Sequence, residues 1–414
     1  MTGSFAAFDE PTATAPRVKK DAPPVADISV CSRFHAFDLA RELSRHGMLR
    51  HLHTGYPSFI ASRFGVRRGH VRSVWSGEPL NRALSALHRA GWIDRRDPQV
   101  SQRHDRIVAS RLRPGADLFI GWSGQCRQSL DVARRFGMTT IVERGSSHVE
   151  WQWAQLTEEA RITGLPVEAP HPLTIEQELA EYDDADFIAV PSAFAARTFV
   201  DRGVPAAKLL VNPYGVDLDI FRAGSDRDES HSADASAVRV LHVGRVSARK
   251  GVHYLVDATR RAGARLTLVG GVDAGMAPVV DGQPGITVAG AVPGGDLPRF
   301  YRDADVFCLL SVEEGLALVV VQAMAMGLPV IATPNTGAEE LIEDGVSGFI
   351  VPARDPGAAA ERLRQLAGDR QLRHDMGRRA RARVANGFSW IDYGARARAF
   401  YTRIAGHART AAAR

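Results

Sequence analysis

The chain has 414 residues, a hydrophobic content of 45% and a net charge of +5 at pH 7. This length exceeds one ordinary core and indicates two domains, each large enough to bury a stable interior. Arginine-rich segments at 106–113 and 362–383 supply most of the basic surplus but lack the interleaved aromatic residues of RNA and single-strand binders, which argues against a nucleic-acid partner. A solvated basic face and an approach to an anionic membrane surface both stay open.

The amino-terminal segment and the cysteines bear on the compartment. Residues 1–24 are polar and rich in alanine, proline and threonine, without the apolar core of a signal peptide, so we expect a disordered leader on a cytoplasmic protein. Peripheral contact with the inner face of the membrane is left open. Cys31, Cys126 and Cys308 are far apart and form no C-x-x-C pair, which argues for free thiols and against a disulfide frame or a zinc site.

Strand and helix patterns alternate through the first half of the chain. The predicted strands cover 27–31, 117–122, 139–143 and 187–190, and the predicted helices cover 36–46, 128–136 and 175–183. Between residues 63 and 113 the pattern is weaker, and we expect helices there. Such alternation predicts a parallel sheet covered on both faces, in a Rossmann-like domain over 25–216.

A linker and a second alternating unit follow. Residues 217–237 lose their hydrophobic periodicity and fill with Asp, Ser and Ala. Beyond them we expect strands at 238–243, 266–269, 306–310 and 349–351 and helices at 252–262, 297–302 and 358–367. This predicts a second Rossmann-like domain over 238–388, and an amphipathic helix in 389–414 that crosses back to the first domain. The fold class is therefore α/β, with two doubly wound parallel sheets facing across a cleft.

The stretch 311–337 is the most informative part of the sequence. Its apolar run is only about 17 residues long, and Gln322, Gly327 and Pro329 interrupt it, whereas a membrane span needs roughly 20. We expect a buried helix over 316–326 that follows two carboxylates, Glu313 and Glu314. A helix start with free backbone N–H groups suits an anion such as a diphosphate, so this stretch is predicted to form one wall of a site.

A second candidate wall is the loop 244–251, which follows the first strand of the second domain. Gly244 and Gly251 let the backbone approach a ligand closely, and Arg245 and Lys250 supply cations that neutralise a diphosphate. Taken alone, this pattern also fits a solvated basic loop.

Together these residues resemble a known family. G-R-x4-K-G at 244–251, paired with E-G-x3-V-x3-A-M-A-x-G-x-P-V-I-A-T at 314–333, is similar to the retaining nucleotide-sugar glycosyltransferases of family 4, which have the GT-B fold of two Rossmann-like domains. The segments 185–192, 212–217, 337–340 and 345–349 extend the resemblance. It runs from about residue 27 to the carboxyl terminus, is strongest over 185–351 and is thin over 54–115.

The resemblance implies roles for individual residues. Arg245 and Lys250 would hold the donor diphosphate beside Gly244, and Glu314 would accept hydrogen bonds from the donor sugar. Gly315, Leu316 and Ala317 would offer backbone N–H groups, so that catalysis would rest on electrostatic stabilisation of the leaving group. The implied mechanism requires no side-chain nucleophile, no metal and no cofactor.

Position 322 departs from the family pattern. The second glutamate of the E-x7-E motif, which binds the nucleotide ribose in the family, is Gln322 here. Exchanging a charge-assisted hydrogen bond for a neutral one costs about 1 kcal/mol of donor binding. An inactive paralogue is the alternative reading of this position. Glu313 has no matching family role, and we expect it to be either solvated or structural.

The first domain also departs from the family. Its first strand is followed by a bulky loop, 31–37, in place of a glycine-rich one, so Ser32 and His35 are predicted to line the acceptor side. Arg144 and His148 follow the strand at 139–143, where relatives place a histidine near the donor sugar. For His35 the alternative is packing, and for Arg144 and His148 it is a capping or supporting role.

We therefore expect a glycosyltransferase that moves a hexose from a nucleoside diphosphate donor to a hydroxyl acceptor with retention. A glycan or lipid-linked acceptor in surface polysaccharide biosynthesis is the expected partner. The alternatives are a non-catalytic sugar-nucleotide binding paralogue and another GT-B enzyme, such as a nucleotide-sugar epimerase or a phosphorylase. A dehydrogenase is disfavoured because neither domain carries G-x-G-x-x-G after its first strand.

Overall fold

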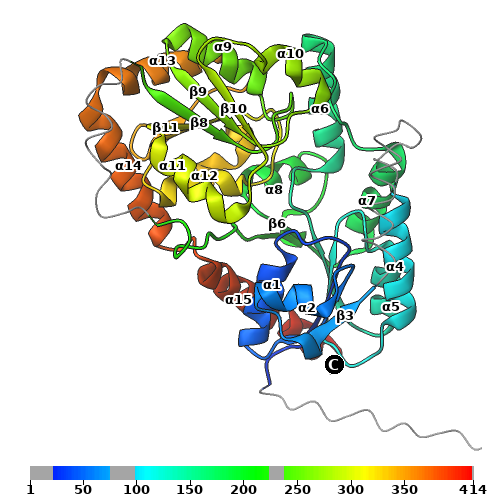
Figure 1. Cartoon of the computed structure of the whole chain (residues 1–414). Coiled ribbons are helices and arrows are strands. Elements are labelled where there is room, and N and C mark those ends of the chain that lie inside the picture. The colour runs from blue at the N-terminus through cyan, green and yellow to red at the C-terminus, as the bar shows by residue number, and fades with distance from the viewer. Residues whose placement is uncertain (1–21, 75–97, 223–236, 413–414) are drawn as a thin grey trace, which may run out of the picture.

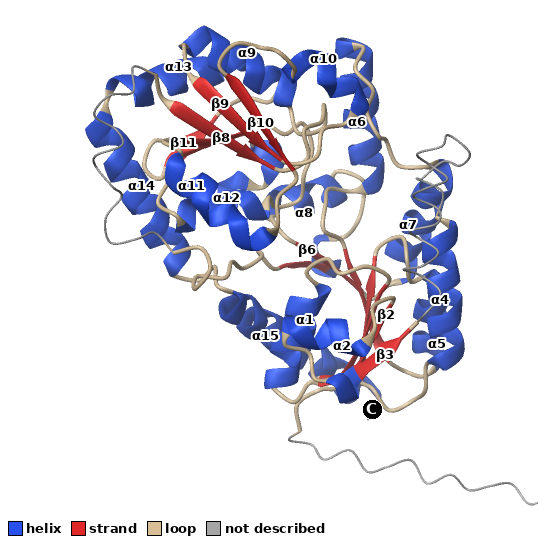
Figure 2. Ribbon diagram, viewed as in Figure 1, coloured by secondary structure: helices blue, strands red, loops and turns tan. Residues whose placement is uncertain are grey.

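The computed structural model describes residues 22–74, 98–222 and 237–412. Residues 1–21 of the expected leader, 75–97 of the weakly patterned region and 223–236 of the expected linker lie outside these ranges. Within the described residues, two parallel β-sheets are each flanked by helices, one above the other in Figure 1 and Figure 2. This confirms the expected α/β architecture of two doubly wound units.

The first sheet has seven strands in the order β3-β2-β1-β4-β5-β6-β7, all parallel. Their bounds are β1 Ala26–Val30, β2 Leu49–Thr54, β3 Val71–Ser73, β4 Leu118–Trp122, β5 Thr139–Glu143, β6 Phe187–Val190 and β7 Leu209–Val211. The four predicted strands are present as β1, β4, β5 and β6. β2, β3 and β7 were not predicted; in β2 two histidines, His51 and His53, interrupt the apolar pattern.

The second sheet has six parallel strands in the order β10-β9-β8-β11-β12-β13. Their bounds are β8 Arg239–Val243, β9 Arg265–Val269, β10 Ile286–Gly290, β11 Val306–Leu309, β12 Val330–Ala332 and β13 Gly348–Ile350. The edge strand β10 was not predicted. Its residues are half-buried or exposed, so it lacks the continuous apolar run of a central strand.

Helices cover both sheets. In the first half they are α1 Ala36–Arg45, α2 Ser58–Ala61, α4 Gln99–Arg111, α5 Arg127–Arg135, α6 Val149–Thr163, α7 Pro172–Asp184 and α8 Ala193–Val200. In the second half they are α9 Val252–Ala262, α10 Ala277–Val280, α11 Leu297–Asp303, α12 Leu318–Ala325, α13 Pro356–Gly368, α14 Arg370–Ala385 and α15 Trp390–Ala412. No helix among the described residues combines the length and the apolar content that crossing a membrane requires.

The strand order fixes where a ligand can bind. β1 pairs with β2 on one side and β4 on the other, and β8 pairs likewise with β9 and β11. Strand order therefore reverses beside β1 and beside β8, and the loops at the carboxyl ends of strands around such a point form the binding crevice of this class of sheet. In the second domain these are the loops that follow β8 and β11.

Two helices join the domains. α15 lies beside α1 (Figure 1), and a Cβ added at Gly394 of α15 would lie 2.4 Å from Cβ of Glu42 in α1. α6 extends from the first domain to the second, where Oε2 of Glu159 accepts a hydrogen bond from Nε of Arg354 at 2.7 Å. Oε1 of the same carboxylate lies 2.9 Å from Nε2 of His253 on α9.

Candidate functional site

The loop after β8 lies against the end of β11. Gly251 adopts φ +65°, and a Cβ there would lie 1.9 Å from the carbonyl oxygen of Leu310, so only glycine fits this position. The close approach places Lys250 next to the loop that follows β11. The two glycine-bounded segments predicted from the sequence therefore meet at the carboxyl edge of the second sheet.

An ion pair lies where these loops meet. Nζ of Lys250 bonds to Oε1 of Glu314, and the two side chains are 17% and 14% exposed. Nη2 of Arg249 lies 3.6 Å from the same carboxylate oxygen. Because both groups are mostly shielded from water, their charges interact more strongly than those of a surface pair. The structure thus brings together two of the three predicted catalytic residues.

Arg245, the third of them, is placed differently. Its Nε bonds to Asp273 and its Nη2 lies 3.6 Å from Glu168 of the first domain, while half of the side chain is exposed. The hydrogen bond that the guanidinium donates to Asp273 raises the pKa of Arg245. Arg249, which was not among the predicted site residues, is the arginine that contacts Glu314.

Glu313 joins the two domains. Its side chain is fully buried, and Nε of Arg249 lies 2.9 Å from Oε2. The hydroxyls of Ser146 and Ser147 each donate to Oε1 at 2.6 Å, and Nε2 of Gln152 donates to Oε2 at 2.9 Å. Burial alone would raise the pKa of this carboxyl, but Arg249 and the two hydroxyls outweigh it and lower the pKa to about 2. Of the two expected roles for Glu313, the solvated one is wrong and the structural one holds.

Gly315 marks a close approach between the domains. A Cβ there would lie 2.3 Å from the carbonyl oxygen of Gly145, which follows β5. The hydroxyl of Ser192 donates to the carbonyl oxygen of Gly315 at 2.7 Å. Loops of both domains therefore meet directly beside the Lys250–Glu314 pair.

The helix behind this loop starts later than expected. α12 begins at Leu318, and Ala317 precedes it in an extended conformation. The N–H of Ala317, expected to face a donor, donates instead to the carbonyl oxygen of Thr336 at 3.1 Å. Gly315 and Leu316 remain candidates for backbone contacts to a ligand.

Gln322 lies on α12 and is half-buried. Its Oε1 accepts a hydrogen bond at 2.9 Å from the hydroxyl of Tyr301, which is itself fully buried. With the oxygen engaged in this way, the amide presents its NH2 group, which donates and does not accept. Gln322 occupies the position at which this chain departs from the family motif, and its bond with Tyr301 was not predictable from the local sequence.

His35 lies in a polar and aromatic cluster of the first domain. Its Nε2 lies 3.2 Å from Oε2 of Glu143, and its ring centroid lies 4.4 Å from that of Tyr214 and 4.9 Å from that of Trp122. The hydroxyl of Tyr401 on α15 donates to Oε1 of Glu143 at 3.3 Å. Glu143 was not predicted as a site residue. Its position at the carboxyl end of a predicted strand could have identified it as one. Ser32 is half-buried in the loop after β1.

Arg144 and His148 take supporting positions. Arg144 is buried; its Nη1 donates to Glu178 at 2.8 Å, its Nη2 to Gln152 at 2.8 Å and its Nε to the carbonyl oxygen of Ser147 at 2.9 Å. His148 caps α6 by accepting from the N–H of Glu150, and burial with nearby Arg144 lowers its pKa to about 4. Both side chains therefore hold the loop after β5 in place, which was the alternative role for each.

Comparisons with known proteins concern the family and the fold of the chain. Residues 237–369, which include the Lys250–Glu314 pair, match the family described as Glycosyl transferases group 1. A D-inositol 3-phosphate glycosyltransferase of Frankia alni is 30% identical over 304 residues, covering 65% of this chain and 69% of that protein. A putative colanic acid biosynthesis glycosyltransferase, WcaL of Salmonella typhimurium, is 29% identical over 204 residues, covering 45% of this chain and 49% of that protein.

The chain spans about half the length of the first curated relatives it matches. Solved structures cover more of it. A sucrose-phosphate synthase from Thermosynechococcus elongatus superimposes with a TM-score of 0.70 at 19% identity, over 92% of this chain and 99% of that one. Anabaena HepE in complex with UDP-glucose gives a TM-score of 0.64 at 16% identity, over 91% and 99%. These two likenesses establish the GT-B fold, and the sequence matches show that the chain belongs to the group 1 glycosyltransferases.

Proposed function

We propose that the chain is a retaining hexosyltransferase of family 4 type, which moves a hexose from a nucleoside diphosphate sugar to a hydroxyl acceptor. The observation that carries this proposal is the Lys250–Glu314 pair. It lies at the carboxyl edge beside β8 and β11, under loops from the first domain. An ammonium and a carboxylate in this crevice match the two ends of a nucleotide sugar, a diphosphate and a set of hydroxyls.

The proposed chemistry is electrostatic. Lys250 neutralises the diphosphate as it departs, and Glu314 accepts hydrogen bonds from the sugar. Because the side chains of Lys250 and Glu314 bond to each other, a donor that binds both of them has to replace part of this ion pair with its own contacts. Arg249 lies 3.6 Å from Glu314 and is placed to take over the released carboxylate charge. No side-chain nucleophile, metal or cofactor enters the proposed mechanism.

The acceptor is proposed to enter from the first domain, beside His35 and Glu143. These two side chains form a hydrogen-bonded pair among aromatic rings, which suits a hydroxylated substrate with apolar faces. Colanic acid biosynthesis appears in the name of one relative, and we propose a glycan or lipid-linked glycan acceptor in surface polysaccharide assembly.

A thermal-shift screen against UDP-, GDP- and ADP-sugars, followed by a donor hydrolysis assay on the best binder, tests this function. A donor present at 100 times its Kd should add about 2.7 kcal/mol to the free energy of unfolding. If no nucleotide sugar shifts the melting temperature, the functional assignment fails. Retention is tested separately by the coupling constant of the anomeric proton in the product.

Gln322 supports one competing function, a sugar-nucleotide binding protein without turnover. Its amide stands where a glutamate completes the family motif, and its oxygen is already bonded to Tyr301. The same screen separates the two functions. A melting-temperature shift without release of nucleoside diphosphate would favour the binding protein.

A further inference from the structure

A second group of charged side chains lies across β1, β2 and β3 at one side of the first sheet. Asp27 on β1, His51 and His53 on β2, and Arg72 on β3 line a cavity of about 340 Å³ together with Arg50 and Arg111. Asp27 is the second residue of its strand, and Arg113, which also lines the cavity, precedes β4. Every residue that lines the cavity belongs to the first domain, and neither Lys250 nor Glu314 is among them, so this cavity is separate from the Lys250–Glu314 site.

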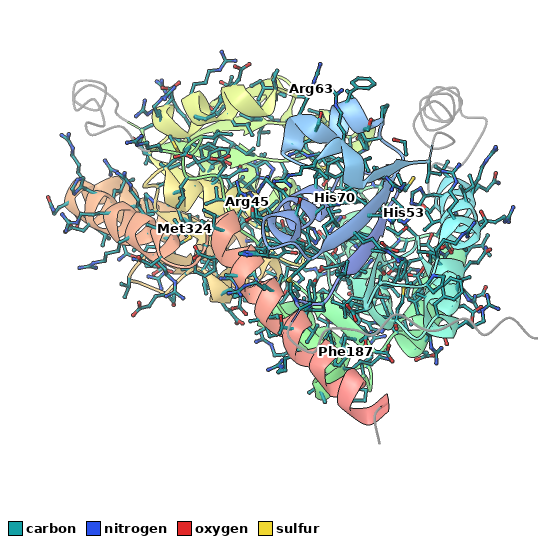
Figure 3. The ribbon with its side chains drawn as sticks, turned by 90° about the horizontal axis from the view of Figure 1, so that it is seen from below. Arg45, His53, Arg63, His70, Phe187 and Met324 are labelled. Atoms are coloured by element: carbon teal, nitrogen blue, oxygen red, sulfur yellow. The ribbon has the colours of Figure 1, made fainter. Side chains whose placement is uncertain are left out.

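His53 is the buried end of the cavity. It is 3% exposed, and both of its ring nitrogens lack a hydrogen-bond partner among the described residues. Figure 3, seen from below, places it beside the blue strands of the first domain, apart from Met324 of α12. A buried polar group without a partner is rare in folded proteins, and one that lines a cavity indicates a ligand that bonds to it.

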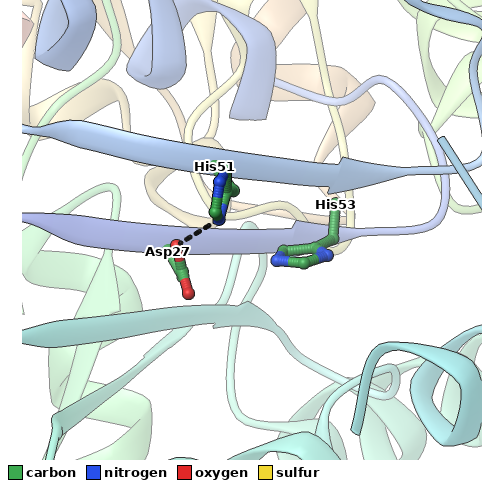
Figure 4. A group of neighbouring side chains, drawn as sticks. All are labelled: Asp27, His51 and His53. Atoms are coloured by element: carbon green, nitrogen blue, oxygen red, sulfur yellow. Dashed lines mark ion pairs between the residues drawn. The ribbon is translucent and has the colours of Figure 1, made fainter. Parts of the chain in front are cut away.

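Two classes of ligand fit a histidine, and the neighbouring contacts choose between them. Asp27, His51 and His53 each offer an atom within 4.8 Å of the others (Figure 4), a set that could hold a transition metal. However, both oxygens of Asp27 already bond to Arg50. Nδ1 of His51 lies 3.4 Å from Asp27, and its Nε2 accepts from Arg72 at 2.8 Å. Of the three metal-binding candidates, only His53 has unused nitrogens.

Charge also opposes a metal ion. Among the described lining residues, Arg50, Arg72, Arg111 and Arg113 face a single carboxylate, that of Asp27. Four positive charges against one negative charge repel a divalent cation and attract an anion. Arg111 uses Nη1 for the carbonyl oxygen of Ser73, and Arg113 uses Nη1 for those of Ser110 and Leu112. Within the described residues their other N–H groups stay available to a ligand.

We propose that this cavity binds a tetrahedral oxyanion of the phosphate class, held by Arg72, Arg111 and Arg113 at its mouth and by an N–H of His53 at its floor. The anion is either a free phosphorylated metabolite or the phosphate of a lipid headgroup. Arginine forks match phosphate oxygens geometrically, and a neutral imidazole supplies one further donor. The site is independent of the proposed transferase chemistry.

The protonation state of His53 also bears on anion binding. Burial lowers the pKa of His53 to about 4, with further lowering from His51, Arg72 and Arg50 and an opposing effect of Asp27. His104 on α4 also faces this group, and its pKa is lowered to about 3 by burial and by His53. A bound anion favours the protonated imidazole, so affinity for sulfate, whose charge is constant from pH 8 to pH 5, should rise as the pH falls.

Calorimetric titration with inorganic phosphate tests the proposal on the full chain. Arg72→Gln/Arg111→Gln should bind about 30-fold more weakly than wild type, because it exchanges two charge-assisted contacts for neutral ones. Arg103→Gln/Arg106→Gln removes the same charge from exposed positions of α4 outside the cavity and should leave the affinity unchanged. Both variants should keep wild-type donor turnover, so a failure here is distinct from a failure of the proposed function.

Sedimentation with vesicles of phosphatidylcholine, with and without phosphatidic acid, distinguishes a lipid headgroup from a free metabolite as the source of the phosphate. Sedimentation with phosphatidic acid that weakens in Arg72→Gln/Arg111→Gln identifies a lipid headgroup, and phosphate binding without sedimentation identifies a free metabolite. Equal phosphate affinity in the two double variants would overturn the proposal. So would tight Zn²⁺ binding that His53→Gln removes in a protein that binds no phosphate.

Discussion

The fully buried carboxylate of Glu313 allows a quantitative test of how the two domains are held together. Its pKa falls from an ordinary value of 4.5 to about 2, because Arg249 and the hydroxyls of Ser146 and Ser147 outweigh the effect of burial. At 1.36 kcal/mol per pKa unit, this corresponds to about 3 kcal/mol of stability. Breaking one partner of a buried ion pair typically costs 3–5 kcal/mol, and Arg249 is 35% exposed, so the lower end applies.

Glu313→Gln should therefore lower the free energy of unfolding by about 3 kcal/mol at pH 7. Because the folded-state pKa is depressed, the contribution of Glu313 is complete above pH 4.5 and is lost as the pH falls towards 2. The gap between wild type and variant should shrink to about half its neutral value near pH 3. Urea unfolding followed by tryptophan fluorescence measures the gap at each pH.

Glu361→Gln is the matched control, since it removes an exposed carboxylate on α13. It should change stability by less than about 0.5 kcal/mol at either pH. A Glu313→Gln variant as stable as this control, or a gap that does not change between pH 7 and pH 3, would refute the assigned role of Glu313.

Two further substitutions test the site itself. Gly315→Ala places a methyl group 2.3 Å from the carbonyl oxygen of Gly145 and should force the domain loops apart. The melting temperature and donor turnover should therefore both fall. Unchanged turnover would contradict the close approach of the two loops. Gln322→Glu restores a charged acceptor that can still bond to Tyr301 and should tighten donor binding by about 1 kcal/mol, or several-fold in Kd measured by calorimetry. Weaker donor binding in this variant would place the ribose elsewhere.

Much of the fold was predictable because periodicity reports burial. Strands buried on both faces, such as β4, appear as continuous apolar runs bounded by turns, and the sequence located them to within a residue or so. α6 was missed because its buried face includes Gln152 and Glu159, which bond across to the second domain. α14 was missed because few of its residues are buried, namely Met376, Gly377, Ala380 and Val384, and one of them is a glycine that packs against the backbone of Gly327.

The site was predictable where its parts are local and unpredictable where they come from different elements. The sequence located Lys250 and Glu314 because each lies in a loop after a strand, and such loops share one edge of a sheet. It could not show that Arg249 contacts Glu314 while Arg245 turns towards Asp273, since the sequence does not distinguish two arginines in the same loop. The exposed arginines near residue 110 likewise gave no sign that β2 places His53 behind them.

Release of nucleoside diphosphate from the best-binding sugar, compared between wild type, Lys250→Ala and Lys208→Ala, tests the central claim most directly. Lys250→Ala should keep the fold and lose at least about 100-fold in turnover, since removing one preorganised stabilising group typically costs that much. Lys208→Ala, the same change in the short turn just before β7 in the first domain, should match wild type. Wild-type turnover in Lys250→Ala would mean that the diphosphate does not bind beside the Lys250–Glu314 pair.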